Sequence, residues 1–198
     1  DDNGPTVLVG CVTSAEHAFC MDSFWSALSA QDFSDFKVIF AEISGDEAYR
    51  KRLLSKGAQV LNIDGLKGTD GIFEARRIIK EVFLDKSFEY LLLIDTDIIL
   101  PPNAISRLMF HKKDIISGAY LSNMKLGEKH DICPCIYDFA DEGFVRVLEL
   151  KEVIDDRVIE IACSGFGCIL LSKKALKIVP MSSSGSSSDD VNFFINAR

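Results

Sequence analysis

The sequence lacks any long uninterrupted apolar run. Its longest apolar stretches, such as Tyr90 to Ile94, are far shorter than the roughly 20 residues that a membrane-spanning helix needs. A basic amino-terminal region followed by an apolar stretch, which would indicate a secretory signal, is also missing. We therefore expect this segment to be soluble and to contain no membrane span.

Positive charge is scarce as well. The chain has 22 Lys and Arg residues against 30 Asp and Glu residues, a formal net charge of -8. Proteins that bind nucleic acid gain affinity from Lys and Arg side chains that neutralise phosphates. The acidic balance therefore argues against a nucleic-acid partner, although a basic pocket is compatible with it.

The six cysteines form no recognisable metal-binding or disulfide pattern. Cys133 and Cys135 make a CxC pair, but no second pair and no suitably spaced His accompanies it, which argues against a zinc site. Cys11, Cys163 and Cys168 lie in or beside apolar runs, where a free thiol behaves as a small hydrophobic group. We expect reduced cysteines and a cytoplasmic protein.

The length of 198 residues and the 47% hydrophobic content predict one domain, residues 1–198, with a substantial core. Apolar runs alternate with amphipathic stretches in the first half, which indicates a mostly parallel sheet covered on both faces. Ligands bind such sheets at the carboxyl ends of the strands. The expected strands are Thr6 to Val12, Phe36 to Ala41, Gln59 to Ile63 and Tyr90 to Asp95, and the expected helices are Ala18 to Ala30, Glu47 to Lys56 and Ile72 to Phe83.

The second half has a different pattern. We expect strands over Asp114 to Leu121, Val158 to Cys163 and Gly167 to Leu171, a meander or hairpin over Asp131 to Leu150 that turns around Asp141 to Gly143, and helices over Ser172 to Ile178 and Asp189 to Ala197. The Ser-rich segment Met181 to Ser188 should be flexible. This predicts a nucleotide-binding half over about residues 1–110 and a smaller mixed or antiparallel, acceptor-side half over about 111–198, which we expect to continue beyond Arg198.

Two carboxylates follow the apolar strand that ends at Ile94. Side chains two residues apart in an extended chain point to the same side, so Asp95 and Asp97 can converge on one hard cation, or on a ribose and a cation. Mg²⁺ or Mn²⁺ held there would neutralise charge on a leaving diphosphate. An Asp pair after a strand is also common as a helix cap or a solvated turn.

The surrounding residues resemble the family 2 glycosyltransferases and their GT-A relatives, in which an apolar strand ends in Asp-x-Asp before a hydrophobic stretch with Pro and a helix. Leu91 to Leu108 is similar to that arrangement. The resemblance implies a GT-A, Rossmann-like α/β sandwich that uses a divalent cation (Mn or Mg) and a nucleotide-diphosphate sugar. UDP is favoured over GDP by frequency in the family.

Two glycine-containing segments extend the resemblance. Gly71 to Arg77 is similar to the family's Gly-x-x-x-Ala-Arg-Asn, with Arg76 at the position near the donor and Arg77 in place of Asn. Gly165, Phe166 and Gly167 match the segment that shapes the acceptor and donor-sugar pocket, where glycine lets backbone approach a sugar. Solvated helix arginines and a bulged strand without a ligand are the alternatives.

Near the end, Asp189 and Asp190 resemble the family's acidic pair, normally Glu-Asp, which precedes its last catalytic helix. The resemblance makes Asp190 the general base of an inverting transfer and puts Asp189 in the sugar pocket. An N-cap role for Ser188 or Asp189 is the alternative.

Further contacts are expected at the ends of the first strands. Thr13 would lie near the nucleotide, and Glu42 or Asp64 could accept hydrogen bonds from its base or ribose, although ordinary loop roles are open for all three. His17, His111 and His130 could each supply a metal ligand, and His111 is better explained as a helix cap.

The predicted reaction is sugar transfer to a hydroxyl of a glycan, lipid-linked or protein acceptor, and the oligomeric state is left open. A sugar-phosphate nucleotidyltransferase is one alternative, but Val9 to Val12 lacks its Gly-rich signature. A haloacid-dehalogenase phosphatase carries Asp-x-Asp earlier in its chain. A non-catalytic nucleotide-sugar-binding domain is a further alternative.

Overall fold

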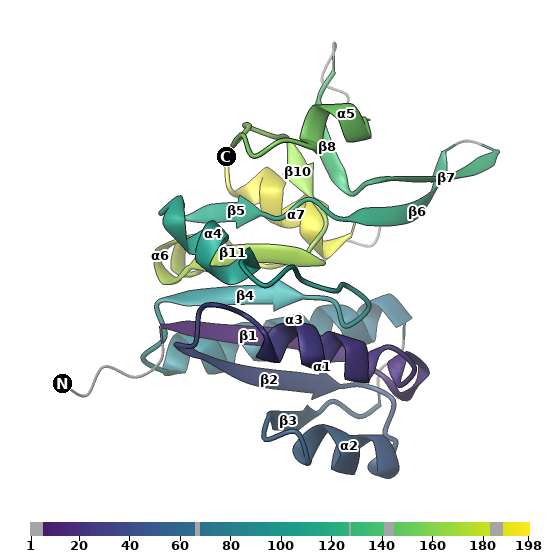
Figure 1. The fold of residues 1–198 in the computed structure, drawn as a ribbon, viewed down its shortest axis with the longest axis vertical. Coiled ribbons are helices and arrows are strands. Elements are labelled where there is room, and N and C mark those ends of the chain that lie inside the picture. Colours follow the sequence, from purple (N-terminus) through teal and green to yellow (C-terminus); the bar gives the residue numbers. More distant parts are fainter. Residues whose placement is uncertain (1–5, 66–67, 127, 141–144, 183–187) are drawn as a thin grey trace.

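The central feature of the computed structural model is a six-stranded sheet in the order β3-β2-β1-β4-β11-β5 (Figure 1). The structure describes residues 6–65, 68–126, 128–140, 145–182 and 188–198. β1 to β4 run parallel, whereas β11 is antiparallel to both of its neighbours. The strands are β1 (Val7–Thr13), β2 (Phe36–Glu42), β3 (Gln59–Asn62), β4 (Tyr90–Ile94), β5 (Ile115–Ser117) and β11 (Cys168–Ser172).

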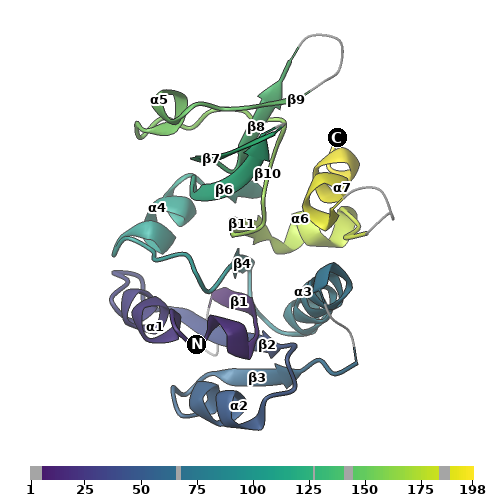
Figure 2. The same ribbon diagram turned by 90° about the vertical axis from the view of Figure 1, so that its right-hand side faces the viewer.

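Helices cover both faces of this sheet (Figure 2). One face carries α1 (Met21–Ser29), α2 (Glu47–Leu54) and α4 (Ala104–Phe110), and the other carries α3 (Gly68–Asp85), α6 (Lys173–Ile178) and α7 (Asp189–Asn196). Each face has its own apolar core, because alternate strand residues point to opposite faces. α3 lies so close to β1 that a Cβ on Gly10 would be 2.5 Å from Cγ2 of Ile79.

Local signals explain where several helices begin. The Asp46 side chain accepts a hydrogen bond from the Tyr49 N–H at 2.8 Å and so caps α2. Ser172 caps α6 in the same way through the Ala175 N–H. A short 3-10 turn, η1 (Ala15–His17), separates β1 from α1.

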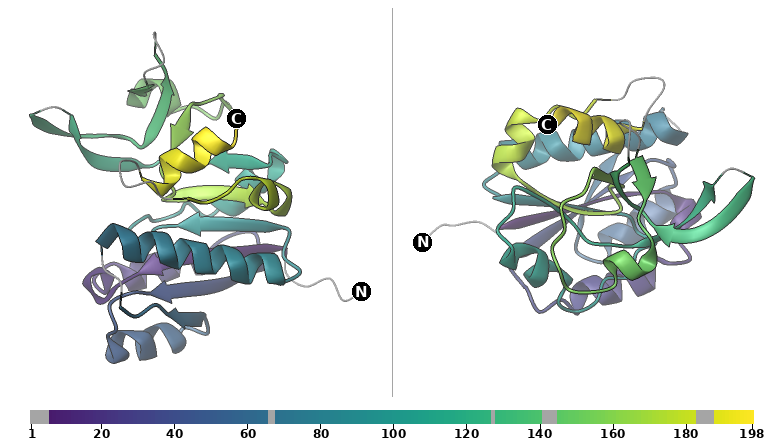
Figure 3. Two further views of the ribbon diagram at one scale, coloured as in Figure 1. Left: turned by 180° about the vertical axis from the view of Figure 1, so that it is seen from behind. Right: turned by 90° about the horizontal axis from the view of Figure 1, so that it is seen from above.

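The second half adds two small antiparallel sheets (Figure 3). One is the hairpin of β6 (Leu121–Leu126) and β7 (Lys129–Pro134), which projects from the body of the molecule; the other joins β8 (Ile136–Phe139), β9 (Val145–Val147) and β10 (Cys163–Ser164). Helix α5 (Leu150–Val153) follows β9. The mixed α/β class with a mostly parallel central sheet is therefore confirmed. No described helix is long and apolar enough to cross a bilayer.

Some predicted elements differ from the observed ones. The strand predicted over Val158 to Cys163 is wrong for all but Cys163, because Val158 is 50% exposed and pairs with no strand. The strand predicted over Asp114 to Leu121 shrinks to β5, and the β6–β7 hairpin was missed. β8 and β9 form the predicted hairpin, but its turn and most of the Ser-rich segment predicted to be flexible (183–187) lie outside the described residues.

Candidate active site

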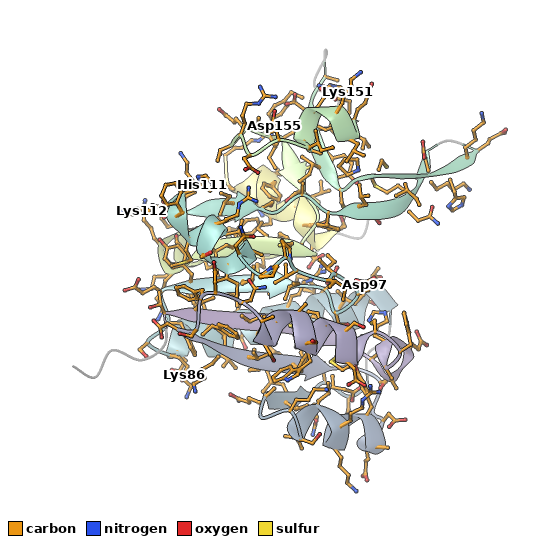
Figure 4. All side chains as sticks on the ribbon, viewed as in Figure 1. Lys86, Asp97, His111, Lys112, Lys151 and Asp155 are labelled. Carbon is orange, nitrogen blue, oxygen red and sulfur yellow. The ribbon has the colours of Figure 1, made fainter. Side chains whose placement is uncertain are left out.

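The predicted site residues gather at the edge of the sheet where the parallel strands end. Thr13 ends β1, Glu42 ends β2, and Asp95 directly follows β4. Figure 4 shows Asp97 at this edge, whereas Lys86, His111 and Lys112 lie toward the opposite edge. His111 and Asp97 nevertheless line one large cavity, and His111 is the C-cap residue of α4.

A buried arginine joins the strand end to the last helix. A terminal nitrogen of Arg76 contacts both carboxylate oxygens of Asp189 at 3.0 and 3.1 Å, and the other lies 3.4 Å from Oδ1 of Asp95. The side chains of Arg76 and Asp189 are only 11% and 10% exposed. The guanidinium also lies over the Phe166 ring, 5.3 Å from its centroid. Arg76 therefore connects α3, β4 and α7.

The charges of this cluster are mutually dependent. Burial opposes the positive charge of Arg76, but the nearby carboxylates, Asp95 foremost, outweigh it and raise the pKa of Arg76. Burial raises the pKa of Asp95, with a further increase from Asp97, while Arg76 acts in the opposite direction. Arg76 thus offsets part of the effect of burial on the pKa of Asp95.

Asp97 is different because its side chain is exposed. It makes no hydrogen bond or ion pair with any residue in the described ranges. Within those ranges no three His, Cys, Asp or Glu side chains gather as a set that could hold a metal ion. Two carboxylates facing solvent fit a cation such as Mg²⁺, which takes one or two protein carboxylates and fills its other positions with water and substrate phosphates.

The glycine-containing segment packs directly against Asp95. The Asp95 N–H donates to the Gly167 carbonyl at 3.0 Å, and the Gly167 N–H donates to the Tyr120 hydroxyl at 3.1 Å. A Cβ on Gly167 would lie 2.6 Å from Cζ of Tyr120, and one on Gly165 would collide with the Tyr120 hydroxyl. Only glycine fits at both positions while Tyr120 stays in place.

The two acidic residues that begin α7 have separate environments. Asp189 is buried against Arg76, whereas Asp190 is half-buried and accepts hydrogen bonds from the Val191 N–H at 2.8 Å and from the Ser188 hydroxyl. Ser188 makes no side-chain cap bond, so the capping role considered for it is not seen. Burial, reinforced by Asp190, raises the pKa of Cys163 in β10 to about 11. Asp190 is thus close enough to both Arg76 and Cys163 to raise their pKa values.

The two carboxylates expected to contact the nucleotide, Glu42 in β2 and Asp64 after β3, already bind other groups of the protein. Both oxygens of the fully buried Glu42 are occupied: one accepts from Ser44, and the other accepts from the Gly45 N–H and from Nε of Arg50 at 2.7 Å. Asp64 pairs with the same Arg50 at 2.5 Å but is 66% exposed. Of these two carboxylates, only Asp64 presents a free surface to a ligand.

A polar chain below the Asp-x-Asp motif was not predicted. The Thr13 hydroxyl lies 2.7 Å from the Tyr49 hydroxyl and 3.4 Å from that of Thr96, which in turn lies 3.2 Å from Nδ1 of His17. Thr96 is the fully buried middle residue of the motif. One feature of the sequence indicated that His17 belongs to the site, namely its position just after β1.

A cavity of about 1170 Å³ opens beside Asp97. Its walls come from residues 97–101, from α4 and β5, from Tyr120, and from the irregular segment 153–162. Many wall side chains are apolar, such as Ile99 and Val158. A large space therefore adjoins Asp97, and α7 contributes Phe194 to its lining.

Comparisons with known proteins give the fold. No family model matches the sequence, and no curated protein matches it. A197 from STIV matches with a TM-score of 0.53 at 13% identity, over 96% of this chain and 77% of that one. S. aureus TarS 1-349 in complex with UDP-GlcNAc matches with a TM-score of 0.58 at 14% identity, over 97% of this chain and 53% of that one.

A third match is 4-diphosphocytidyl-2C-methyl-D-erythritol synthase, with a TM-score of 0.53 at 10% identity, over 96% of this chain and 84% of that one. The chain spans about half of the TarS 1-349 structure and most of the other two. At these identities the matches show a shared fold, the Rossmann-like GT-A type, and the membership of family 2 stays a prediction.

Proposed function

We propose that this domain transfers a sugar from a nucleotide-diphosphate sugar to an acceptor hydroxyl. The observation that carries the proposal is the contact of one buried arginine, Arg76, with both Asp95 and Asp189. It brings the Asp-x-Asp motif and the acidic pair of α7 to one place, although they lie far apart in the sequence. The structure of S. aureus TarS 1-349 in complex with UDP-GlcNAc has the same fold and supports this choice of donor.

In this proposal the donor diphosphate lies over the ends of β1 and β4. Asp97, with Asp95 beside it, would hold the divalent cation, which supplies positive charge to the leaving diphosphate. The role of Arg76 changes from the one inferred from sequence. Because its terminal nitrogens are bound to carboxylates, it positions Asp95 and Asp189 instead of presenting a free cation to phosphate.

Asp190 is the proposed general base. As an acceptor oxygen attacks the anomeric carbon, its proton passes to the Asp190 carboxylate, and the bond from that carbon to the phosphate oxygen breaks with its electron pair. A single displacement of this kind inverts the anomeric centre. The acceptor, whether a glycan, a lipid-linked sugar or a protein, would bind beside Asp190. The six free cysteines support a cytoplasmic, reducing setting.

A panel of UDP- and GDP-sugars with Mn²⁺ tests the proposal through nucleoside-diphosphate release. The Asp97→Asn variant should fold normally, because Asp97 is exposed, and should lose cation-dependent transfer. Unchanged turnover in this variant would refute the role of Asp97. Asp190→Asn should bind donor and lose transfer, and loss of donor binding would instead make Asp190 a structural residue.

Nucleotidyl transfer is the second candidate, favoured by the match that covers 84% of 4-diphosphocytidyl-2C-methyl-D-erythritol synthase. That reaction consumes a nucleoside triphosphate and releases pyrophosphate. Incubation with CTP or UTP and a panel of sugar phosphates, with pyrophosphate as the readout, separates the two reactions. Nucleotide-sugar binding without any turnover would favour a binding domain.

A further inference from the structure

His17 lies at the candidate site, next to the Asp-x-Asp motif. It ends the 3-10 turn η1 that follows β1, and its Nδ1 lies 3.2 Å from the hydroxyl of Thr96, the residue between the two aspartates. The imidazole is half-buried. Its second nitrogen, Nε2, makes no hydrogen bond with any residue in the described part of the chain.

The buried hydroxyls decide which nitrogen carries the proton. Tyr49, Thr13, Thr96 and His17 form a linear chain of contacts, and the Tyr49 hydroxyl at its far end has only Thr13 as a partner among the described residues. Tyr49 is 4% exposed, so its O–H must donate to Thr13 or stay unsatisfied, at a cost of about 1–3 kcal/mol.

Each hydroxyl has one proton to donate, and where each one donates within this chain, the direction set at Tyr49 runs through to His17. Tyr49 donates to Thr13, Thr13 donates to Thr96, and Thr96 donates to Nδ1 of His17. Nδ1 of the neutral ring is then an acceptor, and Nε2 carries the hydrogen. The fold thereby gives His17 an N–H donor that no described residue uses.

We propose that Nε2–H of His17 donates a hydrogen bond to the β-phosphate of the donor nucleotide. This inference rests on the proposed function, because it needs a diphosphate beside Asp95 and Asp97. A donor at this position stabilises the phosphate oxygens of both the bound donor and the nucleoside-diphosphate product. Thr96 has a positioning role, since it fixes the ring through Nδ1.

Two amide variants separate the nitrogens of the ring. His17→Gln can place an amide N–H near the position of Nε2, whereas His17→Asn reaches only the position of Nδ1 and can keep the Thr96 contact. UDP and UMP, each with Mg²⁺, are the binding probes in calorimetry, and GDP and GMP repeat the measurement for the other nucleotide. Thermal unfolding of each variant shows whether it is folded.

The expected result is that His17→Asn weakens UDP or GDP about tenfold, as for one hydrogen bond to a charged group, and leaves UMP or GMP unchanged. His17→Gln should restore most of the diphosphate affinity. Equal losses for the diphosphate and the monophosphate, or no loss in a folded His17→Asn protein, would overturn the inference. Wild-type protein that binds no nucleotide would overturn the proposed function, and the inference with it.

The tautomer is a separate test that needs no ligand. In the neutral ring, ¹⁵N NMR should show a protonated Nε2 and an unprotonated Nδ1. Tyr49→Phe removes the hydroxyl that sets the direction of the chain and should shift the population toward the Nδ1–H form. A wild-type ring protonated at Nδ1 would contradict the inference.

Discussion

The Arg76–Asp189 ion pair gives the sharpest prediction about stability. Arg76→Met removes the cation and leaves Asp189, which is 10% exposed, without its partner. Breaking a buried pair in this way costs about 3–5 kcal/mol. Because the pair keeps some exposure, we expect about 3 kcal/mol, which corresponds to a fall of roughly 6–12 °C in Tm for a domain of this size.

A double-mutant cycle separates the coupling energy between Arg76 and Asp189 from the other effects of the two substitutions. Asp189→Asn keeps one carbonyl acceptor for Arg76 and should cost about 1–2 kcal/mol. The double variant leaves no buried charge without a partner and should cost only about 1–2 kcal/mol, so the coupling energy should be about 3 kcal/mol. Urea unfolding monitored by circular dichroism measures all four proteins.

The neighbouring residue of α3 supplies a matched control. Arg77 and Glu74 lie 2.6 Å apart, closer than Arg76 and Asp189, but their side chains are 40% and 27% exposed. An exposed helix pair contributes little to stability, because solvent screens its charges. Equal coupling in the cycles Arg76→Met with Asp189→Asn and Arg77→Met with Glu74→Gln would refute the argument that burial makes the first pair strong.

Three other results are expected. Gly10→Ala should destabilise the fold by about 1–3 kcal/mol in urea unfolding, because its Cβ would lie 2.5 Å from Cγ2 of Ile79, and an unchanged midpoint would show that α3 is free to shift. Burial raises the pKa of Cys168 to about 11, so peptide mapping after alkylation near pH 8 should show Cys133 modified well before Cys168; equal rates would mean that the core opens. EDTA should leave Tm unchanged, because Arg76 already compensates Asp95, whereas Mn²⁺ with UDP should raise it; a large fall with EDTA would mean that the fold needs the cation.

The parallel half could be predicted from the sequence because its signals are local. An apolar run such as Leu91 to Ile94, followed by Asp95, contains both the buried strand and the polar end that exposes a site. Strand ends in a parallel sheet share one edge, so the meeting of Thr13, Glu42 and Asp95 also follows from the alternation of strands and helices.

The contacts that organise the site could not be predicted in this way. Arg76 and Asp189 are separated by 113 positions, and nothing near either residue indicates that they form a pair. In the segment Val158 to Cys163 the sequence predicted a strand that the structure lacks at Val158. Its β-branched residues favour a strand, but no neighbouring strand pairs with Val158. Strand propensity needs a partner, and partners are set by the whole fold.

The position of β11 between β4 and β5 has a consequence for the synthesis of the chain. β1 to β4 and the helices between them emerge first, and they form a sheet in which Leu91 to Ile94 have no neighbour on one side. An apolar strand edge of this kind invites pairing with other chains. Nascent chains that have not reached Cys168 should therefore depend on chaperones, and the strand that carries the aspartates is protected only once the glycine segment beside it has been made.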